Sequence, residues 1–240
     1  MPGKVTRASA ALTALGALAY TAWVLEVLVR TGLDPVRTYV SELAAEDQPL
    51  GTFFRATDLV AGTLILAGAV TGLLGTGLPR EGGRSSGPRR PASREPWALA
   101  GRIALAVFGA ATVADSRLPL SCAATADPAC AARESAGLVP ATHTAHAFSS
   151  GLAMTAALVA LVALTVAARR RGDRSPLART GPALVAAELA ATVWTLAAVA
   201  AFEAGNGTWA LGAGQRLQVL LVAVWLAVLA YSLTVSPEER

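Results

Sequence analysis

Two histidines near the middle of the chain have a spacing that suits shared chemistry. His143 and His146 are the only histidines present, and their separation of three residues places both on one face of a helix. Such a pair can relay protons or bind a divalent metal, although a metal would need a further ligand such as Asp58 or Asp115. The alternative is a structural pair that forms hydrogen bonds where a helix begins. The sequence leaves both interpretations open.

Three acidic residues lie in or beside long apolar runs, where a buried carboxylic acid can start proton-dependent chemistry. Asp115 ends the apolar run 107–114, at the C-terminal end of an expected helix, where the helix dipole disfavours an anion. It therefore needs a partner such as an arginine or a histidine. Asp58 follows Thr57 at an expected helix start, where either residue could cap the helix. Together with Glu26, these two acids are the candidate catalytic residues.

Six apolar segments must position these residues, and each is long enough to cross a bilayer. They cover about residues 9–29, 56–78, 97–117, 143–168, 180–203 and 211–235. The chain of 240 residues is 54% hydrophobic and only 15% charged, well below the charge of a typical soluble domain. We therefore expect an all-α polytopic membrane protein, a six-transmembrane-helix bundle forming one integral membrane domain over residues 1–240. The first segment is expected to be retained, because residues 25–27 make a poor signal cleavage site.

The positions of arginine and lysine predict the orientation of the bundle. Twelve of them lie in the N-terminal tail and in the second and fourth connections, against five or six on the other side. By the positive-inside rule, we expect the N- and C-termini in the cytoplasm, together with a flexible loop over residues 79–96. Cys122 and Cys130 then lie outside, where an oxidising compartment favours a disulfide. The arginine- and alanine-rich composition is typical of bacteria, so we expect a multi-pass protein of the bacterial cytoplasmic membrane.

Polar residues gather at the outer ends of the six segments in this orientation. Those expected to bind a ligand are Ser41, Glu42, His143, His146, Ser150, Glu203, Gln215 and Arg216. Charged groups within a bilayer are costly and usually face protein or water, so this convergence predicts a polar cup open to the outside. The first loop, residues 30–55, has apolar positions of its own, and we expect it to fold back over the cup.

Several charged residues also have a structural interpretation. Glu26, Glu203 and Arg216 lie close enough to the expected interface to reach water by snorkelling. Arg102 and Glu188 lie in the opposite half of the membrane, where we expect them to form an ion pair between the third and fifth segments.

Short motifs at the outer ends carry a family resemblance. They are Ser41-Glu42-Leu43, the Pro49…Phe54-Arg55…Asp58…Gly62 entry to the second segment, the Asp115 end of the third, the histidine opening of the fourth, and Gly212…Gln215-Arg216. In these motifs the chain resembles an uncharacterised bacterial six-span membrane family, the domain of unknown function 998. The resemblance covers most of the chain and implies a six-span fold without a known chemistry.

Two looser resemblances concern the overall plan. One is to eukaryotic six-span proteins of the DRAM type. The other is to membrane hydrolases of the alkaline ceramidase group, in which Ser41, Asp58, His143 and His146 would match residues around zinc. This chain has no third histidine, an HxxH spacing instead of HxxxH, and six spans instead of seven. These departures argue against zinc-dependent amide hydrolysis.

Three classes of function remain after this reading. The favoured class is a protein that binds or processes a lipid or isoprenoid amphiphile in the polar cup. The second is an enzyme in the same cup, either a carboxylate-initiated isoprenoid cyclase or a metal-assisted hydrolase. The third is a structural or accessory subunit without chemistry. Nucleic acid is not an expected partner, because the basic residues are confined to short loops between apolar segments.

Overall fold

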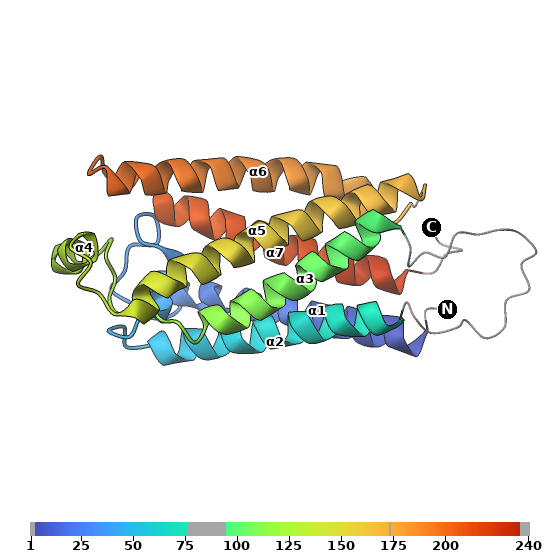
Figure 1. Cartoon of the computed structure of the whole chain (residues 1–240), viewed down its shortest axis with the longest axis horizontal. Helices are drawn as coiled ribbons and strands as arrows, with labels where there is room; N and C mark the ends of the chain where they lie inside the picture. The colour runs from blue at the N-terminus through green and yellow to red at the C-terminus, as the bar shows by residue number, and fades with distance from the viewer. Residues whose placement is uncertain (1–2, 76–94, 173, 236–240) are drawn as a thin grey trace, which may run out of the picture.

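The computed structural model describes residues 3–75, 95–172 and 174–235, and within them the chain is helical without a strand. Six long helices run side by side and share one long axis (Figure 1). They are α1 (Lys4–Tyr20), α2 (Gly51–Gly75), α3 (Pro96–Asp115), α5 (Ala141–Arg170), α6 (Pro176–Glu203) and α7 (Leu211–Thr234). Three shorter elements are the 3-10 helices η1 (Ala22–Val27) and η2 (Val40–Ala44) and the α-helix α4 (Pro128–Ser135).

All six predicted segments are confirmed as helices long and apolar enough to span a membrane. With η1 counted in the first span, the ends of all six spans lie within five residues of the predicted ones. The protein is therefore a multi-pass membrane protein with a six-helix bundle. Most of the predicted loop over residues 79–96 lies outside the described residues, and only its last two residues belong to the structure.

The first segment differs from the single continuous helix that we expected over residues 9–29. Its α-helix ends at Tyr20, and the chain continues as the tighter 3-10 helix η1. Thr21 stands at this change, where its hydroxyl donates to the carbonyl of Leu18 at 2.7 Å. Because a 3-10 turn holds fewer residues than an α-turn, the change alters which side chains face inward. As a result, Glu26 is buried instead of facing the membrane interface.

The six helices form a closed ring. Each packs against its neighbours along the chain, and α7 closes the ring by packing against both α6 and α1. The shared core contains the fully buried rings of Phe108 and Trp225. Alanines along the inner side of α5, such as Ala157 and Ala160, leave room for these rings. Small residues at helix interfaces favour close packing in lipid, where the hydrophobic effect contributes little between helices.

A reciprocal glycine contact sets the distance between α2 and α3. A Cβ atom on Gly62 would lie 2.8 Å from the carbonyl oxygen of Gly109, and one on Gly109 would lie 2.9 Å from the carbonyl oxygen of Gly62. Only glycine allows two helix backbones to approach so closely. Asp58 lies one turn before Gly62, and Asp115 lies beyond Gly109 on the neighbouring helix. The contact therefore brings the two carboxylate-bearing ends together.

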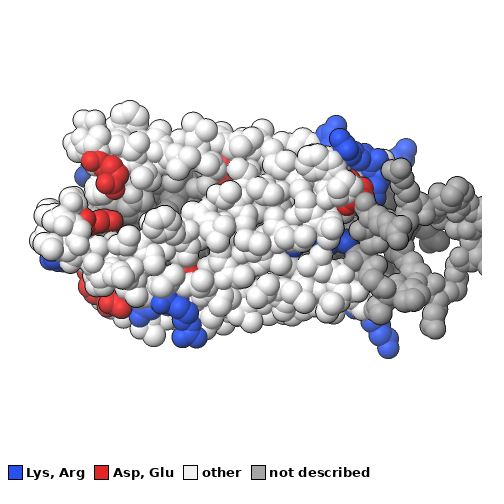
Figure 2. Space-filling view, in the orientation of Figure 1, with Lys and Arg blue, Asp and Glu red and all other residues white. Residues whose placement is uncertain are grey.

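The two ends of the bundle differ in what they carry. One end holds α4 and the first and third loops, and we call it the disulfide end because Cys122 and Cys130 form the predicted disulfide there. The start of α1 and the end of α7 lie at the opposite end (Figure 1). On the face shown in Figure 2, charged side chains gather at the two ends, and the wide band between them is almost uncharged. This pattern matches a bilayer-spanning bundle.

The predicted ion pair between Arg102 and Glu188 does not occur among the described residues. The charged groups that act on Arg102 are Glu95, just before α3, and Arg171, just after α5. Glu188 is buried, and its carboxylate interacts with the Gln218 side chain of α7 instead. The ends of a segment do not fix the rotation of its helix about the helix axis. Arg102 and Glu188 therefore do not meet, although they lie in the same half of the bundle.

Candidate functional site

A cavity of about 100 Å³ lies at the disulfide end. It is enclosed by α1, η1, η2, α2, α3, α5 and α7, whereas α6 contributes no lining residue. Its polar lining consists of Tyr20, Ser41, Thr57, Asp58, Thr112, Asp115, Ser150 and Gln215. The remaining lining is apolar and includes Trp23, Phe54 and Met154. The cavity therefore combines an apolar lining with two carboxyl groups.

Asp115 is held by a network of donors from α5. The hydroxyl of Ser149 donates to Oδ1 of Asp115, and the Ser150 hydroxyl lies 3.0 and 3.1 Å from its two carboxylate oxygens. Nδ1 of His146 lies 3.1 Å from Oδ1 of the same carboxylate and 3.0 Å from the carbonyl oxygen of Leu118. A carbonyl oxygen can only accept, so Nδ1 of His146 carries a hydrogen. Asp115 thus finds the histidine partner that its position at a helix end requires.

These residues include an aspartate, a histidine and a serine, but they lack the geometry of a Ser-His-Asp triad. In a triad the aspartate and the serine bind opposite ring nitrogens, which point away from each other and keep the two partners apart. Here Nε2 of His146 lies 3.1 Å from the Ser150 hydroxyl, which itself lies 3.0 Å from Asp115. Ser150 is therefore hydrogen-bonded to the Asp115 carboxylate, whereas in a triad the serine and the aspartate are held apart. The network positions Asp115 and does not prepare Ser150 as a nucleophile.

Asp58 has a different environment, although it lines the same cavity. Its half-buried carboxylate makes no hydrogen bond or ion pair with any described residue. The charge of Asp115, which lines the same cavity from α3, acts electrostatically on Asp58. Thr57, the alternative capping residue, donates its hydroxyl to the carbonyl of Phe54, and α2 begins earlier, at Gly51. Asp58 is therefore no helix cap and remains available to a ligand.

The first loop forms the roof of the cavity, as its apolar positions predicted. Val40, Ser41, Leu43 and Ala44 of η2 all line it. The backbone N–H of Val40 donates to the side-chain oxygen of Gln215 on α7 at 2.6 Å. A hydrogen bond from the N–H of Ala213 to the carbonyl of Val36, 3.2 Å long, makes a second connection to α7. The roof is thus attached to the helix that closes the ring.

A buried ion pair holds the roof at a third point. Arg216 binds Glu26 through two parallel hydrogen bonds of 2.6 and 2.7 Å, and both side chains are buried. The same guanidinium donates to the carbonyl of Thr38 at 2.7 Å. A two-pronged arginine–carboxylate contact of this kind is strongly directional. Neither Glu26 nor Arg216 lines the cavity, so their visible role is to fasten η1 and the first loop to α7.

Glu42 connects the roof to the disulfide loop. Its fully buried carboxylate accepts hydrogen bonds from the backbone N–H of Thr125 at 2.8 Å, from the Thr125 hydroxyl, and from the N–H of Tyr39 at 3.1 Å. Burial raises the pKa of the Glu42 carboxyl above its ordinary value, although the hydrogen bonds from Thr125 and Tyr39 oppose this effect. A backbone bond from Glu46 to the carbonyl of Leu120, 2.8 Å long, joins the same two loops.

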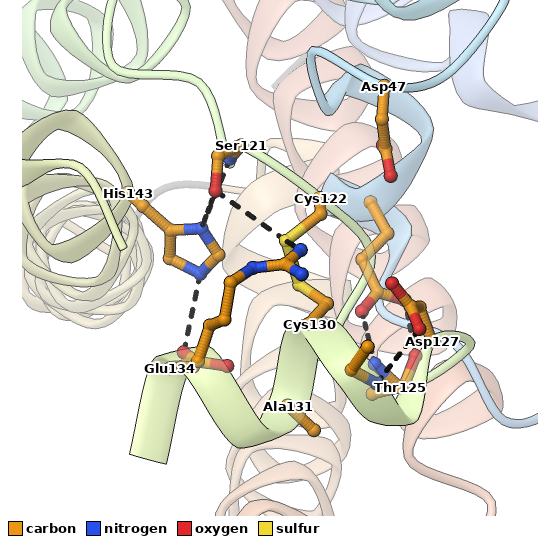
Figure 3. The surroundings of a disulfide bond; sticks show 12 residues. Asp47, Ser121, Cys122, Thr125, Asp127, Cys130, Ala131, Glu134 and His143 are labelled. Carbon is orange, nitrogen blue, oxygen red and sulfur yellow. Dashed lines mark hydrogen bonds and ion pairs between the residues drawn. A yellow bond between two sulfur atoms is a disulfide. The ribbon is translucent and has the colours of Figure 1, made fainter. Parts of the chain in front are cut away.

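His143, in the first turn of α5, contacts the disulfide loop and does not line the cavity. Figure 3 shows its ring between Ser121 and Glu134, beside the Cys122–Cys130 bond. The backbone N–H of Ser121 donates to Nδ1 of His143 at 3.1 Å, so this nitrogen has no hydrogen, and Nε2 faces a Glu134 oxygen at 3.4 Å. Asp127 caps α4 by accepting from the N–H of Ala129, which helps to keep Glu134 in place.

The two histidines do not fit a shared metal ion. Nδ1 of His143 is occupied by a backbone donor, and Nδ1 of His146 carries a hydrogen directed at backbone oxygen. Among the residues that the structure describes, no group of three His, Cys, Asp or Glu side chains could hold a metal. The two rings therefore have separate partners, the disulfide loop for His143 and Asp115 for His146.

The predicted site residues divide into two groups. Those that line the cavity are Ser41, Asp58, Asp115, Ser150 and Gln215. Those that surround or fasten it without lining it are Glu26, Glu42, His143, His146 and Arg216. Glu203 belongs to neither group, because it is exposed at the end of α6. The polar cup thus consists of an inner cavity and an outer set of structural contacts.

Sequence reasoning missed the aromatic side chains of the cavity, Tyr20, Trp23 and Phe54. The indole nitrogen of Trp23 is buried and has no hydrogen-bond partner. A signal was present, because five of the 13 aromatic residues fall between residues 20 and 54.

The comparisons with known proteins agree with this architecture. A family model described as "Protein of unknown function (DUF998)" matches residues 13–232. The chain belongs to this family. The matched region contains every residue that lines the cavity and both cysteines. In the comparisons with curated proteins and with solved structures, nothing matches the chain.

Proposed function

We propose that this protein binds or processes the polar head group of a membrane amphiphile, a lipid or an isoprenoid, in the cavity at the disulfide end. The observation that carries the proposal is Asp58, an acidic side chain in a membrane helix that lines the cavity without a partner among the described residues. A carboxylate in such a place is costly unless it is paired or solvated. A polar group of a ligand would supply the missing partner.

The mixed lining of the cavity supports an amphiphile. Binding sites for small molecules are mostly apolar and contain a few polar groups that orient the ligand. Leu43, Phe54 and Met154 provide the apolar part here, and Asp58 and Ser41 provide polar contacts. The site lies near the ends of the membrane helices. We expect this level to match the depth at which lipid head groups meet their chains.

We propose that the disulfide end faces the outside of a bacterial cytoplasmic membrane. Two observations support this orientation. Arginine is in excess in the second and fourth connections, which join helices at the other end of the bundle. Disulfides form in oxidising compartments outside the cytoplasm. A green fluorescent protein fused to the C-terminus should then fluoresce, because it folds in the cytoplasm. Alkaline phosphatase inserted after Ser135 should be active, because it requires export. The reverse pattern would invert the proposed orientation.

Catalysis in the same cavity is the second candidate, and the pair Asp58 and Asp115 favours it. One carboxylate is fully supported by donors and the other has none, which is the asymmetry expected of an acid and base with separate roles. A carboxylate-initiated reaction on an isoprenoid would use this pair. The third possibility, a subunit without chemistry, predicts that the cavity has no ligand.

Native mass spectrometry of the full chain in mild detergent tests the proposal. The wild-type protein should retain an amphiphile, and Asp58→Asn should retain it at clearly lower occupancy. Glu203→Gln is the matched control, because it removes an acid at the same end that does not line the cavity. Equal occupancy in all three proteins, or none in the wild type, would contradict the proposal. Conversion of the retained molecule during incubation would identify an enzyme.

A further inference from the structure

We infer that the cavity selects amphiphiles whose head group contains an ammonium group. This inference rests on the proposed function and narrows its ligand class. It depends on three features of the cavity: the sign of the charged groups that line it, the aromatic rings that line it, and its volume.

The charged groups that line the cavity are all acidic. Asp58 and Asp115 lie on its wall, and no lysine, arginine or histidine among the described residues does. Arg216, the arginine adjacent to the lining residue Gln215, is turned toward Glu26 and the carbonyl of Thr38. A bare phosphate or diphosphate would meet two acidic groups without a compensating cation, whereas an ammonium group would find an unpaired carboxylate.

The guanidinium groups and the imidazole near the roof are committed to other partners. Arg55 donates to the carbonyl of Ala44 at 2.6 Å and to the hydroxyl of Thr52 at 3.0 Å, which fastens η2 to the start of α2. His146 lies behind Asp115 and makes its contacts with that carboxylate, Leu118 and Ser150. No cationic side chain in the described structure is therefore available inside the cavity to bind an anion.

Three aromatic rings line the same space as the free carboxylate. They are Tyr20, Trp23 and Phe54, which come from α1, η1 and α2. The face of an aromatic ring carries negative potential and attracts cations, tryptophan most strongly, and clusters of such rings recognise quaternary ammonium groups. An uncharged hydroxyl group would gain less from these rings, because it carries no net charge. The combination of rings and one unpaired carboxylate therefore favours a nitrogen cation.

The volume of the cavity suits a small ammonium group. A cavity of roughly 150 Å³ in another protein accommodates benzene, with its six carbon atoms. By that comparison, the cavity of about 100 Å³ has room for roughly four heavy atoms. An aminoethyl or a trimethylammonium group has this size.

Defined ligands can test the inference by native mass spectrometry of the purified full chain. The lipid probes are dihexanoyl phosphatidylethanolamine and dihexanoyl phosphatidylglycerol, which share chains and a phosphate but differ in the ammonium group. Free ethanolamine is the soluble probe. We expect the wild-type protein to bind the ethanolamine lipid about tenfold more tightly than the glycerol lipid, as one charge-assisted contact would give. Free ethanolamine should bind more weakly than its lipid.

Two variants assign the preference to the cavity. Asp58→Asn should remove the preference for the ethanolamine lipid, and it should fold normally because Asp58 has no partner to lose in the described structure. Trp23→Leu should weaken the binding of the ethanolamine lipid more than that of the glycerol lipid. Trp23→Phe should keep much of the preference for the ethanolamine lipid. Glu203→Gln should behave as the wild type. Thermal unfolding of each variant verifies that it is folded.

The outcomes separate this inference from the proposed function. If both lipids bind equally and Asp58→Asn weakens both, the cavity binds amphiphiles without selecting ammonium, and the inference is overturned alone. If Asp58→Asn and Trp23→Leu change the binding of neither lipid, both the inference and the proposed function fall. If free ethanolamine binds as tightly as its lipid, the ammonium selectivity stands, but the ligand is a soluble amine and the proposed function falls.

Discussion

The carboxylate of Glu42 lies against Thr125, a residue inside the loop closed by the Cys122–Cys130 disulfide, and accepts hydrogen bonds from both its backbone and its hydroxyl. Glu42 belongs to η2, whose neighbouring residues form the roof of the cavity. The disulfide therefore influences the cavity indirectly, through a chain of contacts. It fixes Thr125, and Thr125 fixes the segment that covers the candidate ligand.

The first prediction concerns the pH dependence that Glu42 should confer. Burial raises the pKa of its carboxyl above the ordinary value of 4.5, so the folded protein holds this proton more tightly than the unfolded chain does. The stability contributed by protonated Glu42 is present below pH 4.5 and is lost as the pH rises through the raised value. The wild-type unfolding free energy should therefore fall across this window, by at most about 1.4 kcal/mol per pH unit for one proton. Thermal unfolding in detergent at a series of pH values measures it.

Glu42→Gln should lack this component of the pH dependence. Glu46→Gln is the matched control, because it removes a charge from the same loop, but from an exposed side chain. If Glu42→Gln and wild type had parallel stability curves from pH 4.5 upward, the raised pKa of Glu42 would be refuted.

The second prediction is that the disulfide and the Glu42–Thr125 contact are energetically coupled. Closing so short a loop, with cysteines eight residues apart, stabilises the folded chain by roughly 2–3 kcal/mol in the chain-entropy model. Replacing both Cys122 and Cys130 with serine should cost about this much. Thr125→Val should cost less in that background than in the wild type, because a freed loop already holds Thr125 poorly. Additive losses in a double-mutant cycle of thermal unfolding would show that the two contacts act independently.

The third prediction concerns the buried pair of Glu26 and Arg216. Replacing one partner leaves the other charge buried and unpaired, so Glu26→Gln or Arg216→Met alone should cost roughly 3–5 kcal/mol. Replacing both should restore part of that loss, because neither charge then remains. Arg37→Ala provides the contrast, since its ion pair with Asp34 is exposed and should contribute less than about 1 kcal/mol. Similar losses for Arg37→Ala and Arg216→Met would contradict the assigned role.

The behaviour of Glu26 also shows where prediction from sequence reaches its limit. Hydropathy places the six spans because a 20-residue apolar run has few alternatives in lipid. It does not distinguish an α-helix from a 3-10 helix, so the change at Thr21 and the inward turn of Glu26 were not predictable from it. Helix α4 was missed for another reason. It lies in a polar loop, although Asp127 followed by Pro128 is a typical helix start.

The candidate site was predictable in depth but not in rotation. Asp58, Asp115 and Gln215 were placed at the correct level of the bundle, since their distance from a segment end sets their height. Which of these side chains meet depends on how each helix is turned about its axis. The helices are apolar on all sides, so their sequences carry little information on that rotation. For this reason Glu203 was grouped with the cavity, although it is exposed.

The last prediction tests what sets the distance between the two acidic ends of α2 and α3. A Cβ atom on Gly62 would lie 2.8 Å from the Gly109 carbonyl oxygen and 2.8 Å from the backbone nitrogen of Val113, so Gly62→Ala must push the helices apart. Overpacking of this kind usually costs about 1–3 kcal/mol. Gly151→Ala is the control, because nothing lies within 4 Å of its added methyl group, and better helix propensity should make it neutral or stabilising by up to about 1 kcal/mol. Thermal unfolding in detergent compares the stabilities of the two variants.

Because Asp58 is one turn from Gly62, Gly62→Ala should also lower ligand occupancy at the cavity, whereas Gly151→Ala should not. A folded Gly62→Ala variant with unchanged occupancy would show that the glycine contact supports the bundle without setting the geometry of the acidic pair.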